Sequence, residues 1–439
     1  MLVNFKTKNY KSFKDGFEFS LQPTRIRDLP NSLLKFKKEK ILSSGVIYGP
    51  NAAGKTTVIE ALSRIQEIIL NGHINNTTET RTFLKNNKLE YIPFIFAEKN
   101  EPTEFDITFI HDYLKFRFIL KFEIGMFNSS SNRKILLEEL YIDNKEIYSR
   151  EENTVNVYID QINEKYLNDG FTIDNYYNNL KMINKNIQNT KLFLSTDFPS
   201  FISKAICEKT IEWFDEKLCV FNNLKDINFY MESEKSLIEE LPVDIYEATK
   251  RIGVIGSEMF FKKKDKDQNP ELYSVLNING KNISMPSELI ESCGTLHFID
   301  LYPAIIDSLL RGTTLVIDEL DSSLHPHIIM NIINIYHDSD ININNAQLIF
   351  NTHNPFYINN KIFRRDEIFF VEKDRDTKIS DLYKLSDFKT NSDVDTRNTT
   401  DYCSNYFKNK YGAIEYVDLS EEVIKIIKRG NKCEEKVRE

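Results

Sequence analysis

Three carboxylates directly follow an apolar segment in the sequence TLVIDELDSSLH, at residues 314–325. Residues 314–317 have the β-branched and apolar character of a buried strand, and Asp318, Glu319 and Asp321 come after it. Like charges held this close repel one another, and burial raises the cost of keeping them ionised. The spacing therefore predicts a positively charged partner at the end of this strand.

A second motif, GPNAAGKT, can supply that charge. Residues 49–56 fit the pattern G-x-x-x-x-G-K-[ST], and an apolar strand-like segment precedes it while a segment of helical periodicity follows. In such a loop the backbone wraps around phosphates, and N–H groups and the helix N-terminus supply partial positive charge. We expect Lys55 to reach the β- and γ-phosphates. The predicted nucleotide-binding residues are Gly49, Pro50, Asn51, Ala52, Ala53, Gly54, Lys55, Thr56 and Thr57.

The two motifs together predict an ATP site with Mg²⁺. Thr56 and Asp318 are the expected metal-binding residues, and Glu319 is placed to polarise an attacking water as a general base. The alternative is an acidic loop that only caps a buried strand. The P-loop upstream in the sequence favours the metal site over this alternative. Two interpretations of Asp321 stay open: a contact with an opposite subunit, or an N-cap for the helix that follows.

Two further segments contain residues that such a site could use. The segment SCGTL places Ser292 and Gly294 at the start of a predicted helix, which is another anion-binding position. The segment NTHNP ends a strand at His353, which could touch the γ-phosphate, although a single histidine at a strand end is commonly structural. His325 and His327 have no third ligand nearby, which favours a solvated or capping role over a metal site.

The elements that must position these residues indicate an α/β fold. Residues 1–150 contain apolar and alternating segments that predict an antiparallel sheet beside the P-loop strand. Residues 151–270 become helical and polar, and we expect a helical lid or insert there. Residues 271–418 return to strands and helices and complete the first unit, and residues 419–439 form a charged C-terminal tail.

Composition limits the class of protein. The chain has 439 residues and a net charge of −9, which disfavours a surface coated in basic residues for nucleic acid, although a local basic patch stays possible. Its five scattered cysteines form no CxxC pair, which favours reduced thiols over disulfides or structural zinc. The N-terminus lacks an apolar signal segment, and no apolar run approaches the roughly 18 residues that span a bilayer. We therefore expect a cytoplasmic protein with no membrane segment.

In this order, the segments YGPNAAGKTT, SCGTL, TLVIDELDSSLHP and NTHNP resemble the ABC/SMC-related AAA ATPases of the AAA_15 type. The RloA/AbiL branch from phage-defence operons is the nearer match, since NYKSFKD and TTDYCSNYFKNKYGAIEYV are also similar to it; PARIS-type ATPases are similar in outline. The resemblance implies an ABC-type P-loop ATPase head with a mixed central sheet and an antiparallel β subdomain. It also implies that Ser292 and Gly294 complete the nucleotide site of a second subunit.

The same resemblance implies a function in abortive infection. ATP binding and hydrolysis would control homodimers or higher oligomers of the heads and the activity of a partner effector from the same operon, typically a Toprim-related or RloB-like nuclease. DNA binding is possible but not required. Within the chain itself, FFVEKDRD (369–376) is interpreted as a strand of the head with a charged turn, because a metal nuclease needs several convergent carboxylates.

Two other functions remain open. A RecF- or SMC-like DNA-repair ATPase would grip duplex DNA with a salt-dependent affinity, and the acidic net charge weighs against it. A nucleotide-sensing scaffold would bind ATP with little turnover and sequester a toxin. In the ABC-type architecture a glutamine-containing Q-loop joins the lobes, and LFLSTDFPS (192–200) is the candidate for that loop.

Overall fold

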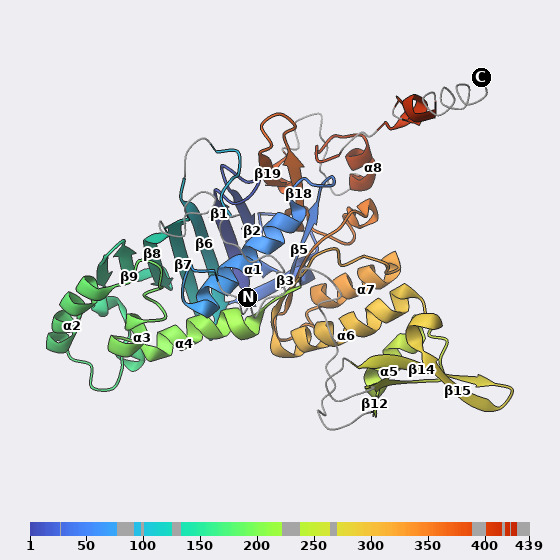
Figure 1. The fold of residues 1–439 in the computed structure, drawn as a ribbon, viewed down its shortest axis with the longest axis horizontal. Coiled ribbons are helices and arrows are strands. Elements are labelled where there is room, and N and C mark those ends of the chain that lie inside the picture. The colour runs from blue at the N-terminus through green and yellow to red at the C-terminus, as the bar shows by residue number, and fades with distance from the viewer. Residues whose placement is uncertain are drawn as a thin grey trace, which may run out of the picture.

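The computed structural model describes residues 1–26, 28–76, 92–97, 101–124, 133–221, 238–263, 270–388, 401–414, 418–421 and 423–427. Two large sheets lie on either side of helix α1 (Lys55–Asn71), as Figure 1 shows. The helix follows the P-loop directly and ends at Gly72, whose left-handed φ of 70° lets its N–H bond back to the last turn. The helix therefore has fixed ends, and its first residue is the lysine of the phosphate motif.

The first sheet is antiparallel, as its alternating sequence predicts. Its order is β10-β9-β8-β7-β6-β1-β2, and every neighbouring pair is antiparallel. Because alternate residues face the core, the sheet buries one phenylalanine-rich face against α1. The strands are β1 (Leu2–Lys8), β2 (Phe17–Ser20), β6 (Thr103–His111), β7 (Leu114–Glu123), β8 (Lys134–Ile142), β9 (Lys145–Glu151) and β10 (Thr154–Val157).

The second sheet is the mixed central sheet, with the order β11-β16-β17-β5-β18-β19. All neighbouring pairs are parallel except β18 and β19, which are antiparallel. Parallel strands end at the same edge, so this topology brings the residues after β5, β16 and β17 together. The strands are β11 (Leu218–Phe221), β16 (Thr314–Ile317), β17 (Gln347–Asn351), β5 (Ser44–Tyr48), β18 (Ile368–Lys373) and β19 (Ser380–Lys384).

Helices cover both faces of the central sheet. On one face, Ile47, Val316 and Ile349 belong to the core that contains α1. On the other face, the intervening strand residues pack against α6 (Cys293–Arg311) and α7 (Pro326–His337), with the short α8 (Tyr402–Phe407) at the margin. Burial on both faces explains why these strands read as unbroken apolar runs. The architecture confirms the predicted α/β P-loop ATPase head with a mixed central sheet and an antiparallel β subdomain.

The region from 151 to 270 is only partly helical. It contains α2 (Ile173–Asn186), α3 (Asp197–Phe201), α4 (Lys204–Glu212) and α5 (Val243–Arg251), but strand β11 within it joins the central sheet beside β16. Its last part forms strands as well. The helical insert expected at 151–270 therefore also contains a segment of the head, because the short apolar run LCVF pairs with β16 as strand β11.

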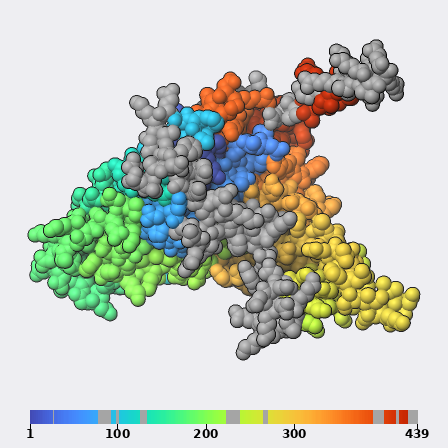
Figure 2. Space-filling model, viewed as in Figure 1, coloured from blue at the N-terminus to red at the C-terminus, as the bar shows by residue number. Residues whose placement is uncertain are grey.

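A separate four-stranded antiparallel sheet projects from the head beside α6 (Figures 1 and 2). It comprises β12 (Ile238–Glu240), β13 (Glu258–Lys262), β14 (Glu271–Ile278) and β15 (Lys281–Pro286); elsewhere β3 (Leu33–Phe36) and β4 (Glu39–Leu42) form a small hairpin. The β14–β15 hairpin turns at Asn279–Gly280, where both residues have the positive φ that an Asn-Gly turn favours. The buried Glu291 carboxylate accepts bonds from the N–H groups of Ile255 and Gly256 and the Ser274 hydroxyl, each at 3.0 Å, and so fastens this sheet to the start of α6.

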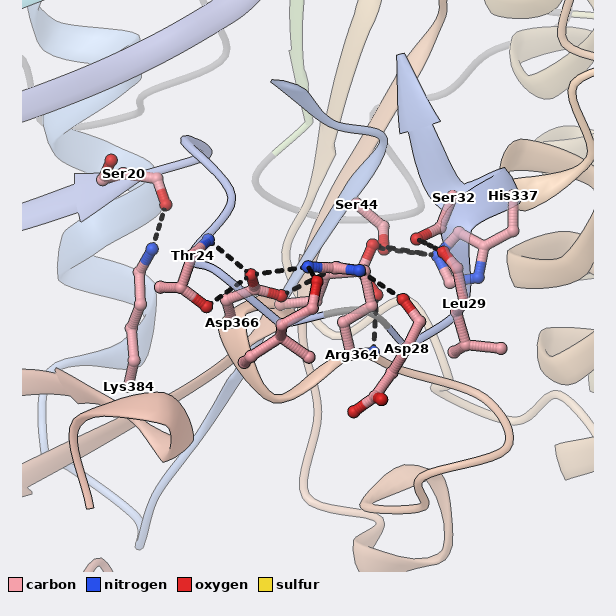
Figure 3. Close-up of polar contacts among 12 residues, drawn as sticks. Ser20, Thr24, Asp28, Leu29, Ser32, Ser44, His337, Arg364, Asp366 and Lys384 are labelled. Atoms are coloured by element: carbon pink, nitrogen blue, oxygen red, sulfur yellow. Dashed lines mark hydrogen bonds and ion pairs between the residues drawn. The ribbon is translucent and has the colours of Figure 1, made fainter. Parts of the chain in front are cut away.

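A buried ionic network supports the outer side of the central sheet (Figure 3). The fully buried side chains of Arg364 and Asp366 form an ion pair at 2.9 Å, and Asp366 accepts from the N–H of Thr24 at 2.7 Å. The Ser44 hydroxyl, at the start of β5, lies 2.8 Å from Nε2 of His337. These contacts fix the strand that leads into the P-loop. Among the helices in the described parts of the chain, none has the length and apolar character needed to span a membrane.

Candidate functional site

Two glycines shape the loop between β5 and α1. Gly49 has a φ of 156°, and a Cβ atom there would lie 2.3 Å from the carbonyl oxygen of Val371 in β18. Gly54 precedes α1 with a φ of 120°, and a Cβ there would lie 3.1 Å from the ring of Phe13. Only glycine fits this close approach without strain. The loop therefore forms a narrow cradle whose N–H groups and helix N-terminus can receive phosphate oxygens.

Lys55 lies inside this cradle. Its Nζ donates to the carbonyl oxygens of Gly49 at 2.9 Å and of Pro50 at 3.0 Å. Burial lowers the pKa of Lys55 to about 8, and the nearby Asp318 and Glu319 oppose that shift. The ammonium is thus held against backbone oxygens at the position where an anionic ligand would provide stronger partners.

The P-loop and the acidic motif meet through Thr56 and Asp318. The Thr56 hydroxyl donates to Oδ1 of Asp318 at 3.1 Å, which joins residues 262 positions apart in the sequence. Asp318 is 9% exposed, and burial raises its pKa to about 6, while the hydrogen bonds from Asn351 and Thr56 act in the opposite direction. A hydroxyl and a largely buried carboxylate therefore lie side by side at the start of α1.

Asn351, the last residue of β17, fixes both members of the acidic pair, and sequence analysis did not identify it. Its Nδ2 donates to Oδ1 of Asp318, and its Oδ1 accepts from the backbone N–H of Glu319 at 2.6 Å. Glu319 has a left-handed φ of 53°, which is unusual for a glutamate. One sequence signal could have identified Asn351, namely its position directly before Thr352 and His353.

The Glu319 side chain faces His353. Nε2 of His353 lies 4.0 Å from Oε1 of Glu319, and both side chains are about half exposed, at 46% and 58%. The pKa of His353 is lowered by burial and by the positive charge of Lys55. At neutral pH the imidazole is therefore uncharged, and Glu319 remains available to interact with a water molecule.

Lys55, Thr56, Glu319 and His353 line a cavity of about 480 Å³ above the P-loop, whereas Asp318 and Asn351 lie outside its lining. Glu319 and His353 lie in its wall, and an aromatic segment, 93–96, also borders it. The full lining is Lys11, Ser12, Asn51, Ala52, Gly54, Lys55, Thr56, Thr57, Pro93, Phe94, Ile95, Phe96, Glu319, His353, Lys373 and Lys378. Of the predicted loop residues, Gly49, Pro50 and Ala53 lie outside this lining, and the carbonyl of Ala53 accepts instead from Ser380 at 2.6 Å.

Asp321 is not part of the cavity lining, and its side chain holds the neighbouring loop. Its Oδ2 accepts from the Thr352 hydroxyl at 2.6 Å. The N-cap interpretation of Asp321 is wrong, because His325 caps α7 by accepting from the N–H of His327. This contact confirms the capping role expected for His325. Within the described residues, no group of three or more potential metal-binding side chains surrounds these histidines.

Ser292 and Gly294 lie at the start of α6, outside the cavity lining of their own chain. The Ser292 hydroxyl accepts from the N–H of Thr295 at 3.1 Å and so caps the helix. A Cβ atom at Gly294 would lie 2.5 Å from the carbonyl oxygen of Ser323. The start of α6 is therefore packed against the loop that follows the acidic motif.

The segment at 192–200 does not lie at the P-loop. The N–H of Leu192 donates to the carbonyl of Gly72, just beyond the C-terminal end of α1. The helix has 17 residues, so its two ends are about 25 Å apart at 1.5 Å per residue. The proposed Q-loop assignment of 192–200 is wrong for this reason. The strand interpretation of 369–376 is confirmed, because β18 lies inside the central sheet.

The donor set fits a Mg²⁺–triphosphate complex. Mg²⁺ in proteins takes one or two side-chain oxygens and completes its octahedron with phosphate oxygens and water. Thr56 and Asp318 provide such oxygens next to the glycine cradle, and burial raises the pKa of the Asp318 carboxyl, a cost that a bound cation would offset.

The family model described as “AAA domain, putative AbiEii toxin, Type IV TA system” matches residues 46–359. The chain belongs to this AAA family. The matched range starts within β5 and ends beyond His353, so it contains the P-loop, the acidic pair and the start of α6. Membership in this family confirms that the chain is an AAA-type ATPase, as the sequence resemblance implied, and implies ATP binding and hydrolysis. No curated protein matches this chain.

Three of the solved structures that this chain resembles are SMC head domains. They are the SMC head domain from Thermotoga maritima (11% identity, TM-score 0.37), an SmcHead bound to the C-winged helix domain of ScpA (10%, 0.39), and an Smc head with an extended coiled coil bound to the C-terminal domain of ScpA derived from Pyrococcus furiosus (10%, 0.40). Each alignment covers 87% of this chain and 96–98% of the other. At such scores the overlap adds nothing to the topology described above.

Proposed function

We propose that this AAA protein is a Mg²⁺-dependent ATP hydrolase of an antiphage abortive-infection system. The contact between Thr56 and Asp318 carries the catalytic part of the proposal, because it places a P-loop hydroxyl and a strand-end carboxylate where one metal ion can reach both. The family description, which names the AbiEii toxin and a type IV toxin–antitoxin system, supports the defence part.

Binding of the triphosphate uses the cradle and Lys55. The backbone N–H groups of Gly49, of residues 51–54 and of the start of α1 face the phosphates. The Lys55 ammonium exchanges its bonds to the Gly49 and Pro50 carbonyls for the β- and γ-phosphate oxygens. Thr56 and Asp318 hold Mg²⁺, which when bound neutralises charge on those phosphates.

Hydrolysis uses the residues on the opposite wall. The Glu319 carboxylate orients a water molecule and takes its proton. Asn351 fixes the backbone of Glu319 so that the carboxylate projects into the cavity. His353, uncharged at neutral pH, lies beside Glu319 and donates to the γ-phosphate.

A second subunit completes the proposed cycle. Ser292 and Gly294 are at the solvent side of α6 and outside the cavity of their own chain, so they are available to the nucleotide of another copy. Their resemblance to the RloA/AbiL branch supports head-to-head dimers. In this proposal, ATP binding closes the dimer, hydrolysis opens it, and the change controls an effector protein encoded in the same operon.

The test compares ATP turnover and dimerisation in two variants. Lys55→Ala should lose ATP binding and turnover, whereas Glu319→Gln should keep ATP binding, lose about 100-fold in kcat and accumulate as a dimer by light scattering. Matched controls are Lys38→Ala and Glu152→Gln, which change exposed charges outside the cavity. Unchanged turnover in both site variants would remove the catalytic assignment.

The effector part has its own test. The full chain is expressed together with its operon neighbours, and the Glu319→Gln variant should retain an operon-encoded partner in the presence of ATP and Mg²⁺. Lys55→Ala should release that partner. Equal retention by both variants would separate partner binding from the nucleotide cycle and contradict the proposed control.

A further inference from the structure

A second large cavity lies beside α2, and it shares no lining residue with the nucleotide cavity. In Figure 1, α2 lies at the left end of the head, whereas α1 runs through its middle. Three segments line this cavity, 156–164, 167–171 and 173–180, and we call it the α2 groove. Its volume of about 1170 Å³ exceeds the roughly 300–1,000 Å³ of pockets that enclose small molecules. The α2 groove therefore has room for a short segment of polypeptide.

The lining of the α2 groove is largely apolar and aromatic. Ile162 and Tyr176 are buried, and the rings of Phe171 and Tyr177 lie 6.2 Å and 5.2 Å from the ring of Tyr176. On the α2 side, Tyr177 is 59% exposed and Ile173 is 61% exposed. Apolar surface of this kind gains free energy when a ligand removes it from water.

Hydrogen bonds hold the three lining segments together. The Tyr176 hydroxyl donates to the carbonyl of Val157 at 3.1 Å, which joins α2 to the end of β10. Nδ2 of Asn168 donates to the carbonyl of Pro199 at 2.8 Å, which joins the middle segment to α3. Because the α2 groove is formed without a ligand, binding would cost little ordering of the protein.

Every charged side chain in the described lining of the α2 groove is acidic. Asp160, Glu164 and Asp169 are exposed, and no lysine, arginine or histidine accompanies them in that lining. Burial and the nearby Glu146 carboxylate raise the pKa of Tyr158, another lining residue, so negative charge also lies beside the groove. Carboxylates next to exposed aromatic rings attract cations, through ion pairs and through the ring faces.

We propose that the α2 groove is a docking site for a segment of a partner protein in which lysine or arginine side chains alternate with apolar ones. The apolar side chains pack on Ile162 and Phe171, and the cations lie between the acidic rim and the ring of Tyr177. A small cation alone would leave the apolar lining in water, and an acidic segment would be repelled. This site goes beyond the proposed function, because it needs neither ATP nor the P-loop.

The test uses a fluorescent ten-residue peptide of alternating leucine and arginine as the probe. Fluorescence anisotropy with the full chain should show binding that weakens as salt is added. The peptide with glutamate in place of each arginine should not bind. The peptide with serine in place of each leucine should bind at least about ten-fold more weakly, because it leaves the apolar lining uncovered.

An aromatic variant tests the site within the protein. Tyr177→Ala should weaken the leucine–arginine peptide about five- to ten-fold, through loss of a ring that contacts both cation and apolar groups. The side chain is largely exposed, so the fold should be retained. Tyr113→Ala, which removes a ring that is 84% exposed outside the α2 groove, is the matched control and should bind as the unaltered protein does.

A pair of charge variants separates the rim from the overall charge of the protein. The double variant Asp160→Asn/Glu164→Gln should weaken the peptide about five-fold. The matched control is Glu240→Gln/Glu258→Gln, which removes the same charge from exposed positions in β12 and β13 and should leave binding unchanged. Equal losses in the two double variants would show only a general attraction to an acidic protein and would overturn the docking site.

Two other outcomes would also overturn the proposal. The first is failure of the unaltered protein to bind the leucine–arginine peptide. The second is a Tyr177→Ala variant that keeps the peptide but has a lower mass by light scattering, which would assign the α2 groove to a contact between copies of this chain. Lys55→Ala should bind the peptide normally, so a failure of the proposed nucleotide site would not affect this result.

Discussion

Asn351 and Asp318 are joined by a hydrogen bond between neighbouring parallel strands, and the same asparagine also accepts from the N–H of Glu319. Asn351 is fully buried at the end of β17, so its amide has one orientation. The position of the two carboxylates is therefore set by a side chain of the adjacent strand as well as by the P-loop.

Removal of this amide should lower catalysis more than ATP binding. We expect Asn351→Ala to reduce kcat by about 10- to 100-fold, the range seen when a residue that orients a metal-binding group is removed, with little change in KM. Steady-state ATPase assays at saturating Mg²⁺ measure both constants.

A second buried asparagine provides the control. Asn342 is 3% exposed and bonds to the backbone of Tyr336 and Ala346. Asn342→Ala should lower the melting temperature and leave kcat intact below that temperature. Equal losses of kcat in both variants would assign Asn351 to stability alone.

Asp318 should destabilise the protein in the absence of Mg²⁺ and nucleotide. Burial raises its folded-state pKa from 3.8 to about 6, so the folded state binds more protons than the unfolded state between these values, and stability falls as pH rises through that window. Above pH 6 the full penalty is present. Asp318→Asn should therefore raise stability at pH 7.5 by on the order of 2 kcal/mol while abolishing ATP turnover.

Asp300 in α6 provides a control, because this residue has no role in the nucleotide site. Burial raises its pKa to about 7, so Asp300→Asn should also stabilise the protein at pH 8 but leave turnover unchanged. Thermal denaturation at pH 5 and pH 8 checks both variants, and the stabilising effect should shrink at the lower pH. A gain at pH 5 as large as that at pH 8 would contradict the electrostatic origin.

His353 should act on the rate and not on metal binding. Its imidazole lies 4.0 Å from Glu319 and is uncharged at neutral pH because burial and Lys55 lower its pKa. Loss of one preorganised donor costs about 100-fold or more in kcat. We expect this loss for His353→Ala, with partial recovery in His353→Gln. An unchanged Mg²⁺ dependence distinguishes this role from a role in metal binding.

Gly294→Ala should disturb the loop after the acidic motif. The new Cβ would lie 2.5 Å from the Ser323 carbonyl, so α6 and this loop must move apart, at a cost of about 1–3 kcal/mol. We expect ATP binding to be retained and turnover to fall. Cys293→Ala, which alters the preceding exposed residue, should have little effect. Equal activity of both variants would show that this contact is not needed.

The motifs at the strand ends were the predictable part of the site. The P-loop and the acidic pair each adjoin an apolar strand, and parallel strands bring their ends together, so the meeting of Thr56 with Asp318 follows from sequence pattern and topology. The antiparallel sheet and the NG hairpin are equally local in origin, since both depend on alternation and turn residues.

The contacts between distant segments could not be predicted in this way. Strand β11 has only four residues, and nothing local assigns it to the edge of the central sheet. Asn351 has no pattern of its own, and its role depends on β16 lying beside β17. The aromatic segment at 93–96 is held by Asn9, which accepts from the N–H of Phe94 and lies more than 80 residues earlier in the sequence.

The attachment of the projecting sheet through Glu291 has a mechanical consequence. This carboxylate binds two backbone N–H groups and a hydroxyl of the small sheet, and Ser292, the cap of α6, is the very next residue. The same end of α6 packs on the loop containing Ser323, which follows Asp318 and Glu319 in the sequence. A displacement of the β14–β15 hairpin would therefore act first on this loop, which lies outside the cavity lining.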